Sequence, residues 1–364
     1  MVLAVQDTTA LNFAGLKEAE GLGPIGGPED RARGLFLHCV LAVRTDGVPE
    51  GLLGMEIWAR GAKEHGKESA RWSRGIRTAR EAVGRKTRVV VVGDRESDIF
   101  EAFEESRRLE CDLLVRAAHD RRVLYEERLM ALTDATFFGE RLGQVTVHIP
   151  RRAGSDEHET RMALHAAEIL VQPPRNRSGR QDPVPLTALW AYEETPEEGQ
   201  APIEWLLLTT LPVTNREEGA RLLRFYSYRW RIERFHFALK SGCGVEKMEL
   251  QMETRLEKAI AVYAMVASRL VHLLYQSRAT PDAPASVAFT DDEWKALYVA
   301  THRSPDVPRL PPTLSTAVIW VARLGGFLAR RGDGNPGVKS LWRGLRKLET
   351  ATTMWQIMSK RTYG

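Results

Sequence analysis

Four consecutive valines at residues 89–92 constrain the fold of this chain more than any other feature. A strand that is apolar on both faces has to be covered on both sides, as in the middle of an α/β sheet. The run ends at Gly93 and Asp94, and the amphipathic segment that follows predicts a helix. This pattern indicates an α/β fold.

The segments around the valine run fit the same fold class. Short apolar runs predict strands at residues 2–7, 34–43, 51–59 and 111–118, and helical periodicity covers residues 68–83. Three strands, a helix, a buried strand, a helix and another strand are the element order of a ribonuclease-H-like domain. Several other α/β folds share that order, so it leaves the topology open.

The rest of the chain divides into three parts by its pattern. Alternating strands predict a β-rich insertion at residues 138–202, after a first core part at residues 1–137. Residues 203–278 complete the core, and residues 279–364 form a helical C-terminal region. In the second core part, Thr214 and Glu217 form a capping-box pattern that predicts one long helix ending near Gly242. A second long helix is predicted at about residues 250–277.

Composition sets limits but does not identify a partner. The chain has 364 residues, 43% hydrophobic, which is enough for two or three domains. The net charge of +4 and the pI near 9.0 are compatible with nucleic-acid binding without proving it. The three scattered cysteines indicate reduced thiols of a cytosolic protein. The longest apolar stretches fall short of the roughly 20 residues that span a bilayer, which predicts a soluble protein without a membrane partner.

A polar stripe on the first long helix is the main candidate for a functional site. Tyr226, Glu233 and Lys240 are spaced seven residues apart, so on a regular helix each lies about 20° from the next. Arg229 lies within about 60–80° of them. The stripe is suited to a metal at Glu233 with phosphates on either side. However, charged stripes commonly face solvent, where an Arg–Glu pair contributes only about 0.2–0.5 kcal/mol, so both interpretations stay open.

Two aspartates at the ends of predicted strands favour the metal site. Asp7 ends the first strand and Asp94 ends the valine-rich one. In open α/β sheets, ligands gather outside the carboxyl ends of central strands. Mg²⁺ prefers carboxylate oxygens, and two such ions held by three carboxylates would stabilise the attacking and leaving oxygens at a phosphodiester. Taken alone, a strand-end aspartate is often only a turn or helix cap.

Together, several segments resemble the DDE transposases of bacterial insertion sequences. They are VQDTT, VVGDRESDIFEAF, EWLLLTTLPV and YSYRWRIERFHFALKSGCGVE. The similarity is to the insertion-sequence-four family, whose Tyr-x2-Arg-x3-Glu-x6-Lys signature is present as Tyr226, Arg229, Glu233 and Lys240. Two C-terminal segments, FTDDEWKALYVATH and LGGFLARRGDGNPGVKSLWRGLRKLE, resemble the family's carboxyl end, so the resemblance covers nearly the whole chain. It implies a ribonuclease-H-like catalytic core with a β-rich insertion and a helical C-terminal dimerisation region.

This resemblance implies a cut-and-paste DNA transposase. By similarity, Asp7, Asp94 and Glu233 are the catalytic triad that binds two divalent ions, normally Mg²⁺, with Mn²⁺ able to substitute. The implied steps are cleavage of transposon ends, hairpin formation and strand transfer into target DNA, all in-line phosphoryl transfers. The implied partners are the terminal inverted repeats, target DNA and a second copy in the DNA complex. The implied location is the bacterial cytoplasm, at the nucleoid.

Five more DNA contacts follow from the resemblance. Tyr226, Arg229 and Lys240 would hold phosphates around the scissile bond. Trp205 matches a tryptophan on which a flipped base stacks, an interaction of roughly 1–3 kcal/mol, although its sequence neighbours alone favour a core indole. Arg116 matches a DNA-contacting arginine, whereas its position alone indicates a surface charge at a strand end.

The chain also departs from the family pattern. Ala118 and Phe237 stand where relatives can carry basic residues, and only six residues precede Asp7, where relatives have a helical DNA-binding domain. Two further interpretations therefore stay open: a truncated, non-catalytic copy that pairs with and inhibits a full-length transposase, and a domesticated nuclease without strand transfer. Near the proposed site, His236 is expected to pack the helix and Asp98 to be a helix-start charge.

Overall fold

The valine-rich strand lies at the centre of a large mixed sheet. The computed structural model describes residues 1–16, 18–27, 32–61, 67–149, 158–174, 182–196 and 202–361. In it, β5 (Val89–Gly93) is buried along its whole length between β1 (Val2–Asn12) and β6 (Asp112–Arg116), and it is parallel to both. The prediction of a strand that is covered on both faces is confirmed.

The strands predicted on the amino-terminal side complete this part of the sheet. β3 (Arg33–Val43) pairs antiparallel with β1, and β4 (Pro49–Trp58) pairs antiparallel with β3. The local strand order is therefore β4-β3-β1-β5-β6, with the short β2 (Gly23–Pro24) also paired to β3. β1 continues to Asn12, so Asp7 lies inside the strand and the prediction that it ends the strand is wrong. The residues after Asp7 pair with β3 in unbroken register, which extends the strand.

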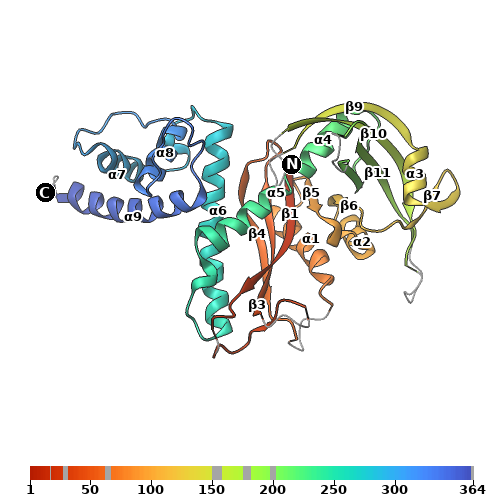
Figure 1. Ribbon diagram of the computed structural model, residues 1–364, viewed down its shortest axis with the longest axis horizontal. Coiled ribbons are helices and arrows are strands. Elements are labelled where there is room, and N and C mark those ends of the chain that lie inside the picture. Colours follow the sequence, from red (N-terminus) through yellow and green to blue (C-terminus); the bar gives the residue numbers. More distant parts are fainter. Residues whose placement is uncertain are drawn as a thin grey trace.

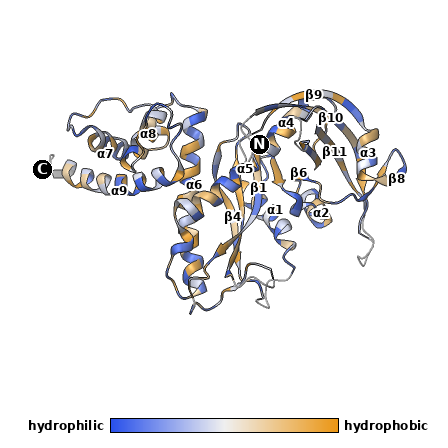
Figure 2. Cartoon of the chain, in the orientation of Figure 1, coloured by the Kyte–Doolittle hydropathy of each residue, from blue (hydrophilic) through white to orange (hydrophobic). Residues whose placement is uncertain are grey.

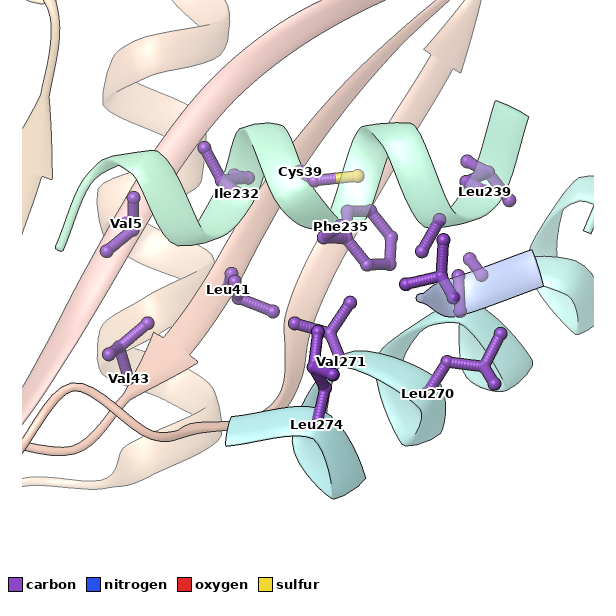
Figure 3. Close-up of a cluster of buried hydrophobic side chains, with 14 of the residues drawn as sticks. Val5, Cys39, Leu41, Val43, Ile232, Phe235, Leu239, Leu270, Val271 and Leu274 are labelled. Atoms are coloured by element: carbon purple, nitrogen blue, oxygen red, sulfur yellow. The ribbon is translucent and has the colours of Figure 1, made fainter. Parts of the chain in front are cut away.

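Helices cover both faces of these strands. α1 (Ala70–Val83) and α2 (Phe100–Arg108) pack on one face, where Trp72 and Phe103 share a buried cluster with the valines. The opposite face is covered by α5 (Trp230–Phe237) and α6 (Glu253–Ala279). Figure 3 shows this second cluster, with Ile232, Phe235 and Val271 meeting side chains from β1 and β3.

The strands that follow β6 in the chain, including those within the predicted β-rich insertion at residues 138–202, extend the same sheet. β12 (Glu204–Thr209) pairs with β6, and the sheet continues through β11 (Val184–Glu193) and β10 (His158–Val171) to β7 (Arg122–Tyr125) and β8 (Arg128–Ala131). β9 (Glu140–Ile149), which follows α3 (Leu132–Phe138), pairs with the same edge of β10 as β7, the edge away from β11. Within the described residues, twelve strands form this one sheet, which curves away from β6 (Figure 1). In the range of the predicted insertion, residues 150–157, 175–181 and 197–201 lie outside the described residues.

The helix predicted at residues 214–242 is interrupted. α4 (Arg216–Ser227) ends before a tight turn at Tyr228 and Arg229, α5 follows, and a π-helical turn, η2 (Ala238–Gly242), ends the segment. The cap is also one residue later than predicted. Asn215 accepts the backbone N–H of Glu218 at 3.0 Å, and the Glu218 carboxylate accepts the N–H of Thr214 at 2.9 Å.

The remaining helices form the lobe that carries the C-terminus. α6 runs from the central sheet into this lobe, where it meets α7 (Asp291–His302), α8 (Leu314–Leu324) and α9 (Val338–Arg361) (Figure 1). Figure 2 shows hydrophobic and hydrophilic residues alternating along α6 and α9. With 27 residues and a window of mean hydropathy 1.3, α6 is long and apolar enough to cross a membrane by length and composition, so the predicted shortfall is wrong. Of that window, 44% is buried inside the molecule.

Candidate active site

Two aspartates from neighbouring parallel strands come together at one edge of the central sheet. Val5 on β1 pairs with Val92 on β5, Asp7 lies two residues further along β1, and Asp94 follows directly after the end of β5. The two carboxylates are close enough for the charge of Asp94 to act on Asp7. The Oδ1 atom of Asp7 accepts the N–H of Thr8 at 2.8 Å. Asp94 caps a 3-10 turn, η1 (Arg95–Ser97), by accepting the N–H of Glu96 at 2.9 Å. Both carboxylates are therefore fixed by local backbone hydrogen bonds.

Glu233 reaches the same region from α5. Its Oε1 atom accepts a hydrogen bond from Nη2 of Arg229 at 2.8 Å, and 38% of its side chain is exposed. Arg229 lies one helical turn earlier and is mostly buried. The third carboxylate is thus held by the guanidinium of the same signature and remains open to solvent on one side.

The carboxylates influence one another electrostatically. Burial raises the pKa of Asp7 to about 7, and the negative charge of Asp94 is the next largest cause. The Thr8 N–H and the Arg229 guanidinium lower this pKa, and Glu233 raises it further. A carboxyl group with a pKa near 7 is only partly ionised at neutral pH, and a nearby cation would favour its ionised form.

The chemistry of the three carboxylates fits a divalent cation, although they do not form a finished ligand set. Oxygen donors that repel one another are what Mg²⁺ or Mn²⁺ would bind. Among the described residues, no group of three or more Asp, Glu, His or Cys side chains is close enough to hold a metal ion. Glu233 accepts a hydrogen bond from Arg229 in this structure and does not complete such a group with Asp7 and Asp94.

Tyr226 and Arg116 also lie close to Arg229. Tyr226 is buried, its pKa is raised by burial, and the charges of Arg229 and Arg116 act against that rise. Arg116 is half-buried at the end of β6, where Nη2 donates to the backbone oxygen of Glu204 at 2.9 Å. The structure thus brings the phenol of Tyr226 and two guanidinium groups together beside Asp94.

Lys240 approaches Asp7 from the π-helical turn. Burial lowers the pKa of Lys240, while Glu246 and Asp7 raise it. The wide turn ends with the N–H of Cys243 donating to the oxygen of Ala238 at 2.7 Å, five residues back. The four signature residues therefore lie near the two aspartates. The helical segment that carries them has a tight turn at Tyr228 and Arg229 and a wide π-helical turn at Lys240.

Trp205 is a buried residue in this structure. Only 6% of it is exposed, and its ring meets Tyr226 edge to face, with 5.6 Å between the ring centroids. It also lines a cavity that Glu233 shares. Trp205 therefore occupies the core position that its sequence neighbours favour, and part of it also faces the cavity.

A buried polar network near the aspartates gave no signal in the sequence. Arg71 on α1 donates from Nε to Oγ1 of Thr8 at 2.9 Å and from Nη2 to Glu96 at 2.6 Å. His38 on β3 lies 2.9 Å from the same Thr8 hydroxyl and 3.1 Å from Oε1 of Gln6. Arg71 thus links the residue after Asp7 to the turn after Asp94. Arginine on an amphipathic helix normally indicates a solvated face, which is why sequence reasoning passed over it.

Two residues near the site differ from expectation. Asp98 is buried, pairs with Arg121 and accepts the N–H of Ala118 at 2.7 Å, so it holds the loop after β6 and is not a helix-start charge. His236 does pack the helix, but its Nδ1 atom also lies 3.7 Å from Oδ2 of Asp7. Burial lowers the pKa of His236 to about 3, with Lys240 adding to the effect, so the ring is neutral at pH 7.

Comparison with known proteins gives two family matches that together cover most of the chain. The family described as "Transposase DDE domain" matches residues 35–268, which include Asp94 and Glu233 but start after Asp7. The family described as "Transposase Tn5 dimerisation domain" matches residues 265–361. Among solved structures, the chain is similar to a piggyBac transposase in a synaptic complex with hairpin DNA. The identity is 8% and the TM-score 0.37, over 74% of this chain and 45% of that chain.

Proposed function

Since the chain belongs to the DDE transposase family, we propose that Asp7, Asp94 and Glu233 form the catalytic triad of a cut-and-paste DNA transposase. The observation that carries the proposal is that Asp94, which follows β5, and Glu233, on α5, both lie close enough for their charges to act on Asp7 of the neighbouring strand β1. The strand order β4-β3-β1-β5-β6 supports a ribonuclease-H-like core. The signature at Tyr226, Arg229, Glu233 and Lys240 supports membership of the insertion-sequence-four family.

In this proposal the triad holds two Mg²⁺ ions, with Mn²⁺ as a substitute. Bound there, divalent ions would activate the attacking oxygen and stabilise the leaving oxygen of a phosphodiester. Arg229 would exchange its bond to Glu233 for a bond to the substrate phosphate, because a phosphate accepts the same two-pronged contact as a carboxylate. Glu233 would then be free to turn toward Asp7 and Asp94.

The surrounding residues would hold the DNA strand. Tyr226 and Lys240 approach the aspartates from two sides, and each is partly or fully buried, so their bonds to phosphate oxygens would form in a poorly hydrated site. Arg116 would bind a phosphate beside Tyr226. Trp205 would stack a flipped base from the cavity side during hairpin formation. The DNA substrates would be the terminal repeats and the target.

A plasmid assay tests the proposal. The substrate is a supercoiled plasmid that carries the gene of this chain with the DNA on both sides, and the products are scored as nicked, linear and joined forms. We expect products with Mg²⁺ or Mn²⁺ and none in EDTA. Asp7→Asn, Asp94→Asn and Glu233→Gln should each fall to the level without enzyme, whereas Glu81→Gln, on the exposed side of α1, should match the wild type. Equal cleavage in EDTA would refute the proposal.

One observation favours a second candidate, a non-catalytic copy that pairs with and inhibits an active transposase. Glu233 is engaged by Arg229, and no three-residue ligand set is finished within the described part of the chain. In that case the wild-type chain would give no products in any divalent metal. Added to an active relative, it would reduce cleavage through mixed dimers.

A further inference from the structure

Glu233 also lines a large cavity, whose lining does not include Asp7 or Asp94. Its volume is about 1180 Å³. Its walls come from α4 and α5, the turn between β3 and β4, strand β9 and the C-terminal end of α6. Arg231 donates from Nε to the backbone oxygen of Gly47 at 2.9 Å, which fixes the β3–β4 turn against α5. Gly47 has a φ of +87°, and an added Cβ would lie 2.6 Å from the ring of Tyr228.

The cavity carries positive charge that is not balanced locally. Arg224, Arg234 and Arg278 line it, are exposed, and form no salt bridge with any described residue. The two carboxylates that line it are already engaged, Asp46 by Arg44 at 2.6 Å and Glu233 by Arg229 at 2.8 Å. An anion that enters the cavity therefore meets guanidinium groups without having to break an existing ion pair.

The guanidinium groups are close enough to repel one another. Burial lowers the pKa of Arg278, and the charges of Arg234 and Arg231 lower it further, against the effect of Tyr275. The rings of Tyr275 and Phe237 keep the arginines near one another. Arg231 lies 4.1 Å and Arg278 5.7 Å from the Tyr275 ring centroid, and Arg234 lies 5.2 Å from that of Phe237. Like charges held together in this way mark a site for a polyanion.

Aromatic side chains complete the lining and narrow the class of ligand. Phe237 lines the cavity, is 42% exposed, and lies beside the guanidinium of Arg234. Tyr228 and Trp230 line the same space. Proteins that bind single-stranded nucleic acid combine basic side chains along the phosphate backbone with aromatic side chains on which the bases stack. In a duplex the bases stack on each other and leave no face for Phe237.

We propose that this cavity binds a single-stranded DNA segment, with Arg231, Arg234 and Arg278 on its phosphates and Phe237 against a base. The inference rests on the proposed function for the identity of the polymer, because a DNA transposase is what brings a DNA strand to Glu233. Glu233 lines the cavity and also belongs to the proposed triad. A strand in the cavity would therefore lead directly to the bond that is cut. A pocket of this volume is of the size that holds a few nucleotides and not a duplex.

The test measures binding of a labelled oligo-dT of about 20 nucleotides by fluorescence anisotropy, between about 50 and 200 mM KCl. The double variant Arg234→Gln/Arg278→Gln should bind at least about 10-fold more weakly, and its plot of log affinity against log salt should be shallower by about 1.4, or about 0.7 for each lost phosphate contact. The matched control Arg309→Gln/Arg323→Gln removes the same charge from exposed positions in the C-terminal lobe and should match the wild type. Identical affinity and slope in both double variants would overturn the proposal, as would a wild type that does not bind the oligonucleotide.

A second pair of variants tests the aromatic contact without changing charge. Phe237→Leu should weaken binding about 10-fold, whereas Phe237→Trp should keep it, because a tryptophan preserves the stacking face. A duplex of the same length should be insensitive to both substitutions, and an equal loss for duplex would refute the single-strand assignment. The plasmid assay separates this result from the proposed function. If the wild type cleaves the plasmid but the cavity variants bind the oligonucleotide as the wild type does, the cavity site alone is refuted. If the wild type binds the oligonucleotide but does not cleave the plasmid, the triad alone is refuted.

Discussion

Single residues behind the aspartates decide how firmly the site is held. Arg71 contacts Thr8 and Glu96, and so joins the two strand ends that carry Asp7 and Asp94. It is 9% exposed and lies between the rings of Trp58 and Trp72, 5.9 and 5.5 Å from their centroids. A planar, always charged group with several donors suits this bridging position, and lysine could not form the same set of bonds.

Arg71→Gln is expected to reduce plasmid cleavage by about 10–100-fold and to raise the Mg²⁺ concentration needed for half-maximal cleavage, because residues that support metal ligands act on metal affinity. The measurement is a Mg²⁺ titration of the cleavage rate, together with the melting temperature. Arg74→Gln is the matched control, since Arg74 lies on the same helix as Arg71 but pairs with Glu56 on β4 and contacts neither Thr8 nor Glu96. A merely structural role would lower the melting temperature and leave the Mg²⁺ midpoint unchanged.

His38 gives the fold a dependence on pH. Burial lowers its pKa to about 3, with the charges of Arg71, His236 and Arg74 adding to the effect. An unfolded histidine titrates near 6.5, so below that pH the unfolded chain binds the proton that the folded chain excludes. The free energy of unfolding should therefore fall by about 1.4 kcal/mol per pH unit for this residue as the pH drops from 6.5 toward 3.

Between pH 7 and pH 5, His38 and His236 both lower the stability of the wild type as the pH falls, whereas Asp7, whose pKa is raised to about 7, acts in the opposite direction. The two histidines outweigh the one aspartate, so the melting temperature should still fall. His38→Gln is expected to flatten that dependence, because glutamine does not titrate. The comparison is between slopes, so a lower starting stability in the variant does not affect it. An unchanged slope would show that His38 carries its proton in the folded state.

Among single residues, the sequence could indicate those that stand in a local sequence pattern. Asp94 follows a run of four valines, and Glu233 belongs to a spaced signature, so both could be predicted. Arg71 and His38 could not, because they are separated from the aspartates by tens of residues and acquire their role only through contacts across the sheet. Asp98 was interpreted as a helix-start charge for the same reason: its partner Arg121 lies beyond the following strand.

Among the elements, the segment from α4 to η2 has a helical pattern that predicts the helix but not its two irregular turns. Periodicity predicts a helix there, and helix is what forms over most of residues 216–242. The tight turn at Tyr228 and the wide turn at Lys240 alter the rotation per residue, so a uniform 100° step does not describe how the signature residues meet. Neither turn has a proline or glycine at its centre, so no residue in the sequence predicts it. The tight turn lies next to the β3–β4 turn, where Arg231 donates to the backbone oxygen of Gly47, and the wide turn packs against α6 and α9.

The cap of α4 can be tested directly. Asn215→Ala should cost about 1 kcal/mol of stability, because it leaves the N–H of Glu218 without its acceptor. Thr214→Val removes only an exposed hydroxyl contact to Glu218 and should cost less than about 0.5 kcal/mol. Urea denaturation of the two variants gives the comparison. If Thr214→Val proved the more costly substitution, the cap predicted from sequence would be correct after all.

For the whole molecule, the sequence indicated the parts better than their connections. An α/β core, β-rich middle and helical end were all visible in the patterns. That β12 pairs with β6, and so joins the middle part to the core in one sheet, depends on register between strands about 90 residues apart. No local pattern encodes such a pairing. The sheet is also why the cavity beside Glu233 exists, since β9 forms one wall of it.

The C-terminal lobe exposes apolar side chains that the single chain does not cover. Val262 and Met265 on α6 and Met354, Ile357 and Met358 on α9 are between 48% and 65% exposed. The residues on α9 recur at spacings of three and four, so they lie on one side of that helix. This lobe matches the family described as a transposase dimerisation domain. The description of that family suggests dimer formation, and we propose that a second copy of the chain covers this face.

We therefore expect Met354→Asp/Ile357→Asp to convert the protein from dimer to monomer without unfolding it, because a charge in a buried apolar interface has no partner there. Light scattering over a concentration series gives the mass. Leu310→Asp is the control, since Leu310 is 78% exposed but lies outside α6 and α9. A control that dissociates as readily as the double variant would mean that charge alone, and not this face, governs assembly. If the double variant stayed dimeric, the two copies would have to meet through another surface.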